Sequence, residues 1–325
     1  MSMKAVGLFS GGLDSIIACH LILDQNIQVI CLHINAPFIV SEINAVEKSF
    51  RTLRDRGAEL VVEELSSDFL NILMAPKHGY GSQMNPCIDC HIYMLRAGKN
   101  LMVEIGAEFV FTGDVLGERP MSQSKGALDI IKKESGLEGM LLRPLSAKLL
   151  KPTEVEIDGR VDRDRLLDIK GRSRSRQLEL AEVYGLEFIP SPAGGCLLTD
   201  VAYARKVKEA MEHKELSLEL LHLFRYGRHF RLPSGSRLIV GRNESENKVL
   251  EGFSGDEYIL LEPKNDMGPT CLLIGDDDIE LASSIMARYC DGEGDVRVRV
   301  NRGGLELELL AKRLEDSRVR ELMVK

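Results

Sequence analysis

The residues with the clearest chemical potential form the hexapeptide S-G-G-L-D-S at positions 10–15, here called the phosphate loop. It follows the apolar run 4–9, which predicts a buried strand, and precedes a helical pattern over 16–24. Two glycines allow a tight turn, and the unpaired N–H groups of a helix start favour an anion such as a phosphate. The candidate nucleotide-binding residues are Ser10, Gly11, Gly12, Asp14 and Ser15, with Asp14 available for Mg2+ or as a helix cap.

Three cysteines form a second group. Cys87 and Cys90 lie in N-P-C-I-D-C-H, where Pro86 predicts a helix start, so the two thiols share one helix face near its N-terminus. That position favours thiolates. Cys196 follows two glycines in P-S-P-A-G-G-C at 190–196.

These three cysteines allow three kinds of site. We expect a 4Fe-4S cluster with one iron lacking a protein ligand. The alternatives are a persulfide carrier with a resolving cysteine, and a structural zinc site or unrelated buried thiols. The remaining cysteines are expected to be packing residues; they are Cys19, Cys31, Cys271 and Cys290.

The phosphate loop after an N-terminal strand resembles that of ATP pyrophosphatases, and with the three cysteines it is similar to tRNA thiolation enzymes. T-G-D-V-L-G-E-R-P-M-S-Q at 112–123 is similar to the T-G-E-S-L-G-Q-x-x-S-Q motif of 4-thiouridine synthetases, and the 2-thiouridylases are a second similar group. Asp114 stands where that family has Glu, and Glu118 where it has Gln. The resemblance covers about residues 1–200. It implies sites near the nucleotide or target base at Gly113, Asp114, Ser122 and Gln123, with Asp114 catalytic.

The elements that must position these residues alternate between strands and helices. The predicted strands are 4–9, 28–34, 59–65, 108–112 and 139–143, and a predicted amphipathic helix covers 41–56. This alternation implies an α/β fold with a doubly wound parallel sheet, whose ligands bind beyond the carboxyl ends of the strands. His33 ends the second strand, where similar pyrophosphatases hold adenosine; the alternative is a hydrogen-bonded wall residue.

Local basic clusters decide whether RNA binds, because the formal net charge of the 325-residue chain is −8. The segment 170–176 is K-G-R-S-R-S-R. Its alternating cations suit phosphates of RNA or ATP, and the alternative is a solvated helix start. The candidates are Lys170, Arg172, Arg174 and Arg176.

A domain boundary is expected between 212 and 213, giving a pyrophosphatase domain at 1–212 and a smaller α+β domain at 213–325. The second domain carries two predicted hairpins and resembles the NFACT-R RNA-binding domain through G-R-H-F-R at 227–231 and V-G-R-N-E-S-E-N at 240–247. The implied RNA contacts are Arg228, Arg231 and Arg242, and the alternative is an interdomain or dimer surface.

The whole chain is interpreted as an ATP-dependent tRNA sulfurtransferase that uses ATP, Mg2+ and a 4Fe-4S cluster or zinc. Its expected partners are tRNA and a sulfide or persulfide donor, and it is compatible with a homodimer. Seven cysteines are an odd number, which argues against a disulfide framework. With no apolar run long enough for a bilayer and no secretory signal, we expect a cytoplasmic location. The alternatives are an amidating ligase acting on a small carboxylate and a non-catalytic nucleotide- and RNA-binding protein.

Overall fold

The computed structural model describes residues 3–40, 43–190, 195–253 and 255–324. The chain divides into an N-terminal unit, Met1–Asp200, and a C-terminal unit, Val201–Lys325. This division precedes the boundary expected at 212, because α8 (Val201–Glu212) packs with the C-terminal unit. Tyr203 Oη donates to Leu221 O at 2.5 Å, and Lys206 Nζ donates to Phe224 O at 2.7 Å.

The N-terminal unit contains a five-stranded parallel sheet in the order β3-β2-β1-β4-β5. Its strands are β1 (Lys4–Leu8), β2 (Gln28–Asn35), β3 (Glu59–Glu64), β4 (Phe109–Thr112) and β5 (Leu141–Leu142). The doubly wound α/β fold expected from the sequence is confirmed.

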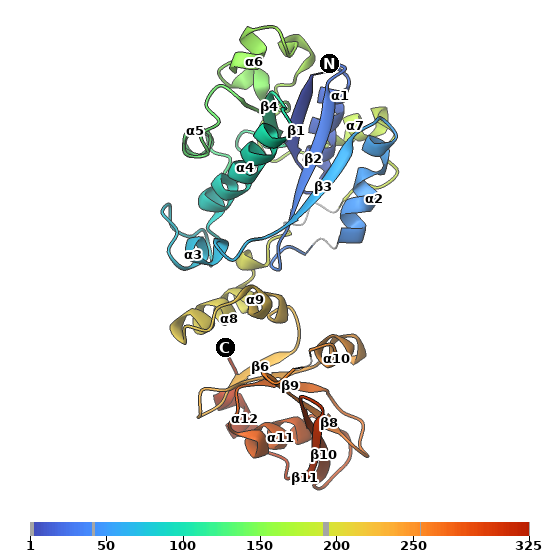
Figure 1. The fold of residues 1–325 in the computed structure, drawn as a ribbon, viewed down its shortest axis with the longest axis vertical. Coiled ribbons are helices and arrows are strands. Elements are labelled where there is room, and N and C mark those ends of the chain that lie inside the picture. The colour runs from blue at the N-terminus through green and yellow to red at the C-terminus, as the bar shows by residue number, and fades with distance from the viewer. Residues whose placement is uncertain (1–2, 41–42, 191–194, 254, 325) are drawn as a thin grey trace. The chain divides into compact units, whose positions relative to one another are not determined.

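Helices cover both faces of this sheet (Figure 1). One face carries α1 (Leu13–Leu23), α2 (Ile43–Arg54) and α7 (Ser175–Val183), and the other carries α4 (Cys87–Glu104) and α5 (Lys125–Glu134). The short helices are α3 (Phe69–Met74) and α6 (Glu154–Ile157). β1 lies between β2 and β4 in the sheet. The connection that leaves β1 and the connection that enters β4 therefore lie on opposite faces of the sheet. Such a switch point creates a crevice beyond the carboxyl ends of these two strands.

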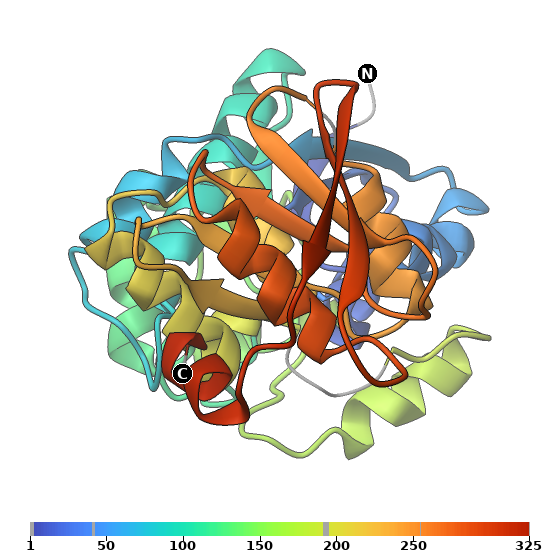
Figure 2. The same cartoon turned by 90° about the horizontal axis from the view of Figure 1, so that it is seen from below.

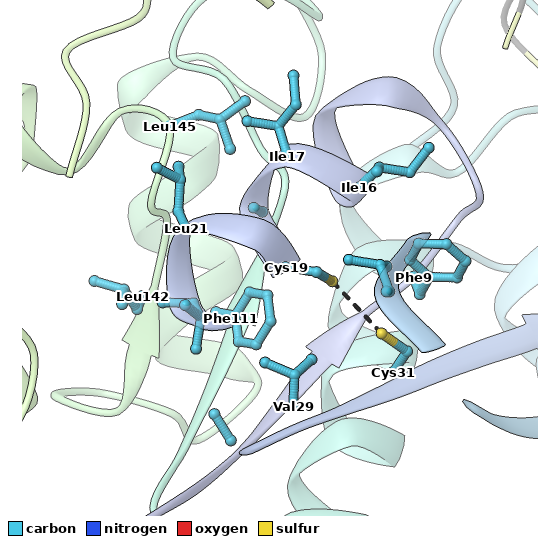
Figure 3. Close-up of a cluster of buried hydrophobic side chains, with 14 of the residues drawn as sticks. Phe9, Ile16, Ile17, Cys19, Leu21, Val29, Cys31, Phe111, Leu142 and Leu145 are labelled. Atoms are coloured by element: carbon cyan, nitrogen blue, oxygen red, sulfur yellow. Dashed lines mark hydrogen bonds between the residues drawn. The ribbon is translucent and has the colours of Figure 1, made fainter. Parts of the chain in front are cut away.

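The core beneath α1 is apolar and includes two of the cysteines predicted to be packing residues (Figure 3). Cys19 on α1 and Cys31 on β2 are fully buried, with their Sγ atoms 3.5 Å apart. Phe9 packs edge-on against Phe50 of α2, with ring centroids 5.9 Å apart. This packing holds α1 in place, and the N-terminus of α1 is the helix start at the phosphate loop.

The C-terminal unit contains an antiparallel six-stranded sheet in the order β11-β10-β8-β9-β7-β6. Helix α11 packs on this sheet, as Figure 2 shows. The strands are β6 (Arg228–Arg231), β7 (Arg237–Val240), β8 (Tyr258–Pro263), β9 (Cys271–Ile274), β10 (Val296–Arg302) and β11 (Leu305–Ala311). The helices besides α8 are α9 (Leu218–Leu223), α10 (Glu244–Glu251), α11 (Ile279–Arg288) and α12 (Asp316–Leu322). Both predicted hairpins and the α+β class are confirmed. In the described part of the chain, no helix has the length and apolarity needed to cross a bilayer.

Candidate nucleotide and thiol site

The phosphate loop turns sharply between β1 and α1. Gly11 has a φ of +74°, which favours glycine, and Gly12 is the N-cap of α1. Ser15 Oγ donates to Gly12 O at 2.7 Å, and Gly12 N donates to Ser10 Oγ at 3.2 Å. The cap position belongs to Gly12, so Asp14 does not cap the helix, and its carboxylate is available for other contacts.

Gly113 brings the segment after β4 against this loop. A Cβ atom at Gly113 would lie 2.6 Å from Ser15 N and 2.7 Å from the carbonyl carbon of Asp14. No side chain fits in that space. The glycine predicted from the motif is therefore required for the close approach of two backbone segments at the switch point.

Asp14 is surrounded by both signs of charge. Gln177 Nε2, from α7, donates to Asp14 Oδ1 at 3.2 Å. Burial raises the pKa of Asp14 above its usual value, and the negative charge of Asp114 adds to this. The hydrogen bond from Gln177 and the charges of Arg174 and Arg119 act in the opposite direction. The charges of both arginines therefore favour the ionised form of the Asp14 carboxylate.

Asp114, which the family resemblance assigns a catalytic role, lies at the centre of a buried network. Thr112 Oγ1 and Gln123 Nε2 donate to its carboxylate at 2.8 and 3.1 Å, and Arg143 Nε lies 3.4 Å from it. Although burial opposes it, these partners and His91 hold the pKa of Asp114 below its usual range. Burial lowers the pKa of His91, so Arg143 is the permanent cation of the network. Asp114 therefore positions the segment 112–123.

The remaining predicted residues around the nucleotide are buried. His33 lies in β2, with its Nδ1 2.8 Å from Phe9 O, and burial lowers its pKa. A neutral imidazole that donates to this carbonyl supports the strand end before the phosphate loop, as in the wall-residue alternative. Ser122 is 2 % exposed, and Gln123 Oε1 accepts from Arg119 N at 3.0 Å.

Cys87 is the first residue of α4, and its sulfur has a specific donor. Asn85 Nδ2 donates to Cys87 Sγ at 3.1 Å. The amide orientation is fixed because Asn85 Oδ1 accepts from Gln83 N at 3.0 Å. An N–H donor and a helix N-terminus both stabilise negative charge on this sulfur.

Cys196 is held beside the end of β2. It pairs with Ile39 in an isolated antiparallel bridge, and Leu197 N donates to Phe38 O at 2.8 Å. Burial raises the pKa of Cys196 to about 11, and Cys87 contributes to the rise, whereas the amide of Leu198 opposes it. Of the glycines that precede it, Gly195 accepts from Val40 N at 2.7 Å, while residues 191–194 lie outside the described part of the chain.

The three cysteines influence one another and share a neighbour with the phosphate loop. Burial raises the pKa of Cys90, and the charges of Cys196 and Cys87 raise it further. Arg119 lowers the pKa of Cys196 and also that of Asp14. The three thiols therefore lie within electrostatic range of one another. His91, which follows Cys90 on α4, has its Nδ1 3.8 Å from Asp114 Oδ1, and Asp114 follows the glycine that approaches the phosphate loop.

Two family models match separate parts of the chain. Residues 1–151 match the thiamine biosynthesis protein (ThiI) model, and residues 227–321 match the NFACT protein RNA binding domain. We call these two regions the ThiI-type domain and the NFACT-type domain after the models that they resemble. The resemblances indicated by the sequence motifs are thereby confirmed.

Two curated relatives match more than half of the chain. A probable tRNA sulfurtransferase of Methanothermobacter thermautotrophicus is 26% identical over 238 residues, covering 71% of this chain and 54% of the relative. One from Thermococcus kodakarensis is 24% identical over 189 residues, covering 58% and 45%. The chain thus spans about half the length of these curated relatives.

Two solved structures are partly similar. A 4-thiouridine synthetase–RNA complex with bound ATP has a TM-score of 0.37 at 20% identity, covering 68% of this chain and 52% of that one. The U34-tRNA thiolase NcsA from Methanococcus maripaludis, with its 4Fe-4S cluster, has a TM-score of 0.34 at 18% identity, covering 69% and 71%.

The basic segment 170–176 lies beside the nucleotide site of the ThiI-type domain. Lys170 forms an isolated parallel bridge with Leu116, two residues after Asp114. Arg174 influences the Asp14 carboxylate, whereas Lys170 and Arg172 are exposed to solvent. Arg176 is exposed too, with its guanidinium 3.2 Å from Glu179. The segment thus has one cation that acts on Asp14 and three that face solvent.

The arginines predicted for the NFACT-type domain are largely engaged within it. Arg231 Nε donates to Glu209 at 2.6 Å, and its guanidinium also pairs with Glu215. Arg242 Nε donates to Glu246 at 2.9 Å. The guanidinium of Arg228 lies 4.9 Å from the centre of the Tyr289 ring. The neutralised charges of Arg231 and Arg242 make them weaker phosphate ligands than the sequence indicates.

Some residues of the site escaped sequence reasoning. Arg119 lies inside the 112–123 motif and Asn85 lies beside the Cys87–Cys90 motif, so their positions in the sequence could have indicated a place in the site. Arg143 and Gln177 come from β5 and α7 regions without any motif. Only the tertiary contacts with Asp114 and Asp14 place them in the site.

Proposed function

We propose that the chain is an ATP-dependent tRNA sulfurtransferase. The observation that carries this proposal is a chain of contacts from the thiol-bearing helix to the phosphate loop. His91, next to Cys90 on α4, lies 3.8 Å from Asp114, and the adjoining Gly113 packs against the backbone of the loop. The ThiI-type domain, its sulfurtransferase relatives and the NFACT-type domain support the same interpretation.

The reaction we propose solves a leaving-group problem. The carbonyl oxygen of a uridine attacks the α-phosphorus of ATP, so pyrophosphate departs and the base carries AMP. A sulfur nucleophile then attacks the activated carbon, and AMP leaves with the oxygen. Backbone N–H groups at the start of α1 and the nearby arginines stabilise the departing pyrophosphate. Mg2+ would bind phosphate oxygens with Asp14, because Mg2+ usually needs only one or two protein carboxylates in such sites.

Cys87, Cys90 and Cys196 are the proposed sulfur-handling residues. Among the described residues, no three His, Cys, Asp or Glu side chains are grouped closely enough to hold a single metal ion. Cysteines on different irons of one cluster lie farther apart than ligands of one zinc ion, and the Asn85 donor suits a charged sulfur. A cluster held by three cysteines would supply an iron open to an external sulfide. Burial raises the pKa of two of these thiols, so a cationic cluster would keep them as thiolates.

The proposed partners are tRNA, bound by both units, and a sulfide or persulfide donor. We place tRNA phosphates at Lys170, Arg172 and Arg176, where the charges face solvent, and at Arg228 in the NFACT-type domain. A homodimer stays a prediction.

The test separates activation from sulfur transfer. Anaerobically purified protein is given ATP, sulfide and tRNA transcripts, and the release of AMP and pyrophosphate is measured beside thionucleosides in the digested RNA. We expect Cys87→Ser and Cys196→Ser to abolish thionucleoside formation and Asp14→Asn to reduce pyrophosphate release as well. The control Cys290→Ser changes a thiol of the C-terminal unit and should behave as the wild type.

Two outcomes would contradict the proposal. Full thiolation activity in both cysteine variants would remove the thiols from the chemistry. The same assay with a panel of small carboxylates in place of tRNA tests the alternative of an amidating ligase. AMP release that depends on a carboxylate and is not changed by RNA would favour that alternative.

A further inference from the structure

A cavity of about 190 Å³ lies between α2 and the segment 186–188, apart from the phosphate loop and the three thiols. It is smaller than the roughly 300–1,000 Å³ of pockets that enclose a whole small molecule. Its size suits a single flat group or a phosphate rather than a complete ATP.

The charges around this cavity are mostly positive. Lys48 and Arg51, both exposed residues of α2, contribute to its lining, as does one carboxylate, Glu187. Neither cation has an ion-pair partner within the described ranges, in contrast to Arg231 and Arg242. Unpaired cations of this kind are suited to a phosphate of a nucleic-acid backbone.

An aromatic ring and a hydroxyl complete the lining. Phe188 is 42% exposed, which leaves part of its ring available for stacking. Thr52 Oγ1 lies 3.2 Å from His20 Nε2. Arg56 donates to His20 Nδ1 at 3.0 Å, so the imidazole proton is on Nε2 and Thr52 accepts it. The Thr52 hydroxyl hydrogen is therefore free to donate to a ligand.

The cavity adjoins the phosphate loop. Ser49 lines it, and Ser49 Oγ is 3.7 Å from the point where a Cβ of Gly11 would lie. A ligand in the cavity would thus lie close to the proposed site of reaction.

We propose that this cavity binds one unpaired base of the RNA substrate against Phe188, with the adjoining phosphate outside the cavity at the exposed Lys48 and Arg51. The inference rests on the proposed function, since it adds a contact for the same substrate. Stacking on an aromatic ring combined with a cationic backbone contact is the usual mode for single-stranded RNA.

The test uses the absence of tryptophan from the chain. Phe188→Trp in the full chain creates a single reporter, and Ile157→Trp, at a position 72% exposed on α6, is the matched control. A single-stranded oligonucleotide RNA, a tRNA transcript, AMP and inorganic phosphate are the probes. We expect saturable quenching by both RNAs in Phe188→Trp only.

A charge test accompanies it. The double change Lys48→Gln/Arg51→Gln should reduce the slope of log affinity against log salt by roughly 1.4, from about 0.7 for each phosphate contact with a single strand. Phe188→Ala should weaken RNA binding at least about fivefold, since stacking contributes appreciably for each base. The control Lys125→Gln/Lys133→Gln removes two exposed charges from α5, on the opposite face of the sheet, and should leave the slope less changed.

Unchanged emission on RNA binding would overturn the proposal, as would equal quenching by AMP, which would assign the cavity to the ATP base. Failure of the proposed function itself would be seen in a different experiment, because the wild-type protein would then form no thionucleosides in the thiolation assay.

Discussion

His20 offers a quantitative test of the packing beneath the phosphate loop. It is 1% exposed on α1 and stacks on Tyr184 of the α7 end, with ring centroids 4.4 Å apart. Arg56 donates to its Nδ1, so a second proton on the imidazole would face a guanidinium. Burial, and then the charge of Arg56, lower the pKa of His20 from 6.5 to about 4.

The direction and size of the effect follow from proton linkage. In the unfolded chain His20 binds a proton near pH 6.5, whereas in the native protein it stays neutral until about pH 4. The unfolded state therefore binds more protons in this window, and stability falls as the pH falls through it. The full difference is about 3 kcal/mol, and the loss between pH 7 and pH 5 is about 2 kcal/mol.

The assay is urea unfolding of the full chain at pH 7 and pH 5. His20→Gln retains an acceptor for Arg56 and a donor for Thr52 but cannot titrate. The variant should therefore lose about 2 kcal/mol less than the wild type between the two pH values. His213→Gln, at an exposed position in the C-terminal unit, is the control. Equal losses in wild type and His20→Gln would refute the reasoning.

Three further predictions concern the site and the C-terminal unit. Gly113→Ala places a methyl group 2.6 Å from a backbone nitrogen of the phosphate loop, so ATP affinity measured by calorimetry should fall at least about tenfold. Asn85→Ala removes the N–H donor to Cys87. Alkylation of the Cys87 thiol in metal-free protein at pH 7, measured by peptide mass spectrometry, should therefore slow about threefold to tenfold. Glu215→Gln removes one carboxylate from Arg237, which is 1% exposed, and should lower the free energy of unfolding in urea by about 2 kcal/mol.

Each of these changes has a matched control. Gly126→Ala adds a methyl group where nothing lies within 4 Å, and ATP affinity should be retained. In Asn85→Ala, the alkylation rate of Cys196 should stay as in the wild type; parallel slowing of both thiols would indicate a general disturbance. Glu212→Gln changes an exposed carboxylate on α8, and a loss as large as that of Glu215→Gln would contradict the network argument.

Local sequence patterns were sufficient to predict most of the fold. Apolar runs at β1, β2 and β4 alternate with helical periodicity, and parallel strands joined in this way allow few arrangements. The helix covering α5 was not anticipated, nor was the attachment of α8 to the C-terminal unit. The Ser124 cap and the apolar spacing of Ala127, Leu128 and Ile131 are local signals for α5. The attachment of α8 depends instead on contacts with residues distant in sequence, to which a local pattern is insensitive.

The sequence by itself determined the ligand-bearing motifs, because backbone turns and thiol spacing are short-range properties. It identified the phosphate loop, the paired thiols of α4 and the glycine at 113. The tertiary structure decided which charges remain available. Arg231 meets Glu209 only after the C-terminal unit has folded, and Cys196 is held near β2 by its bridge with Ile39. Electrostatic interactions depend on distance in space rather than along the chain, so arginines with similar sequence surroundings have different roles.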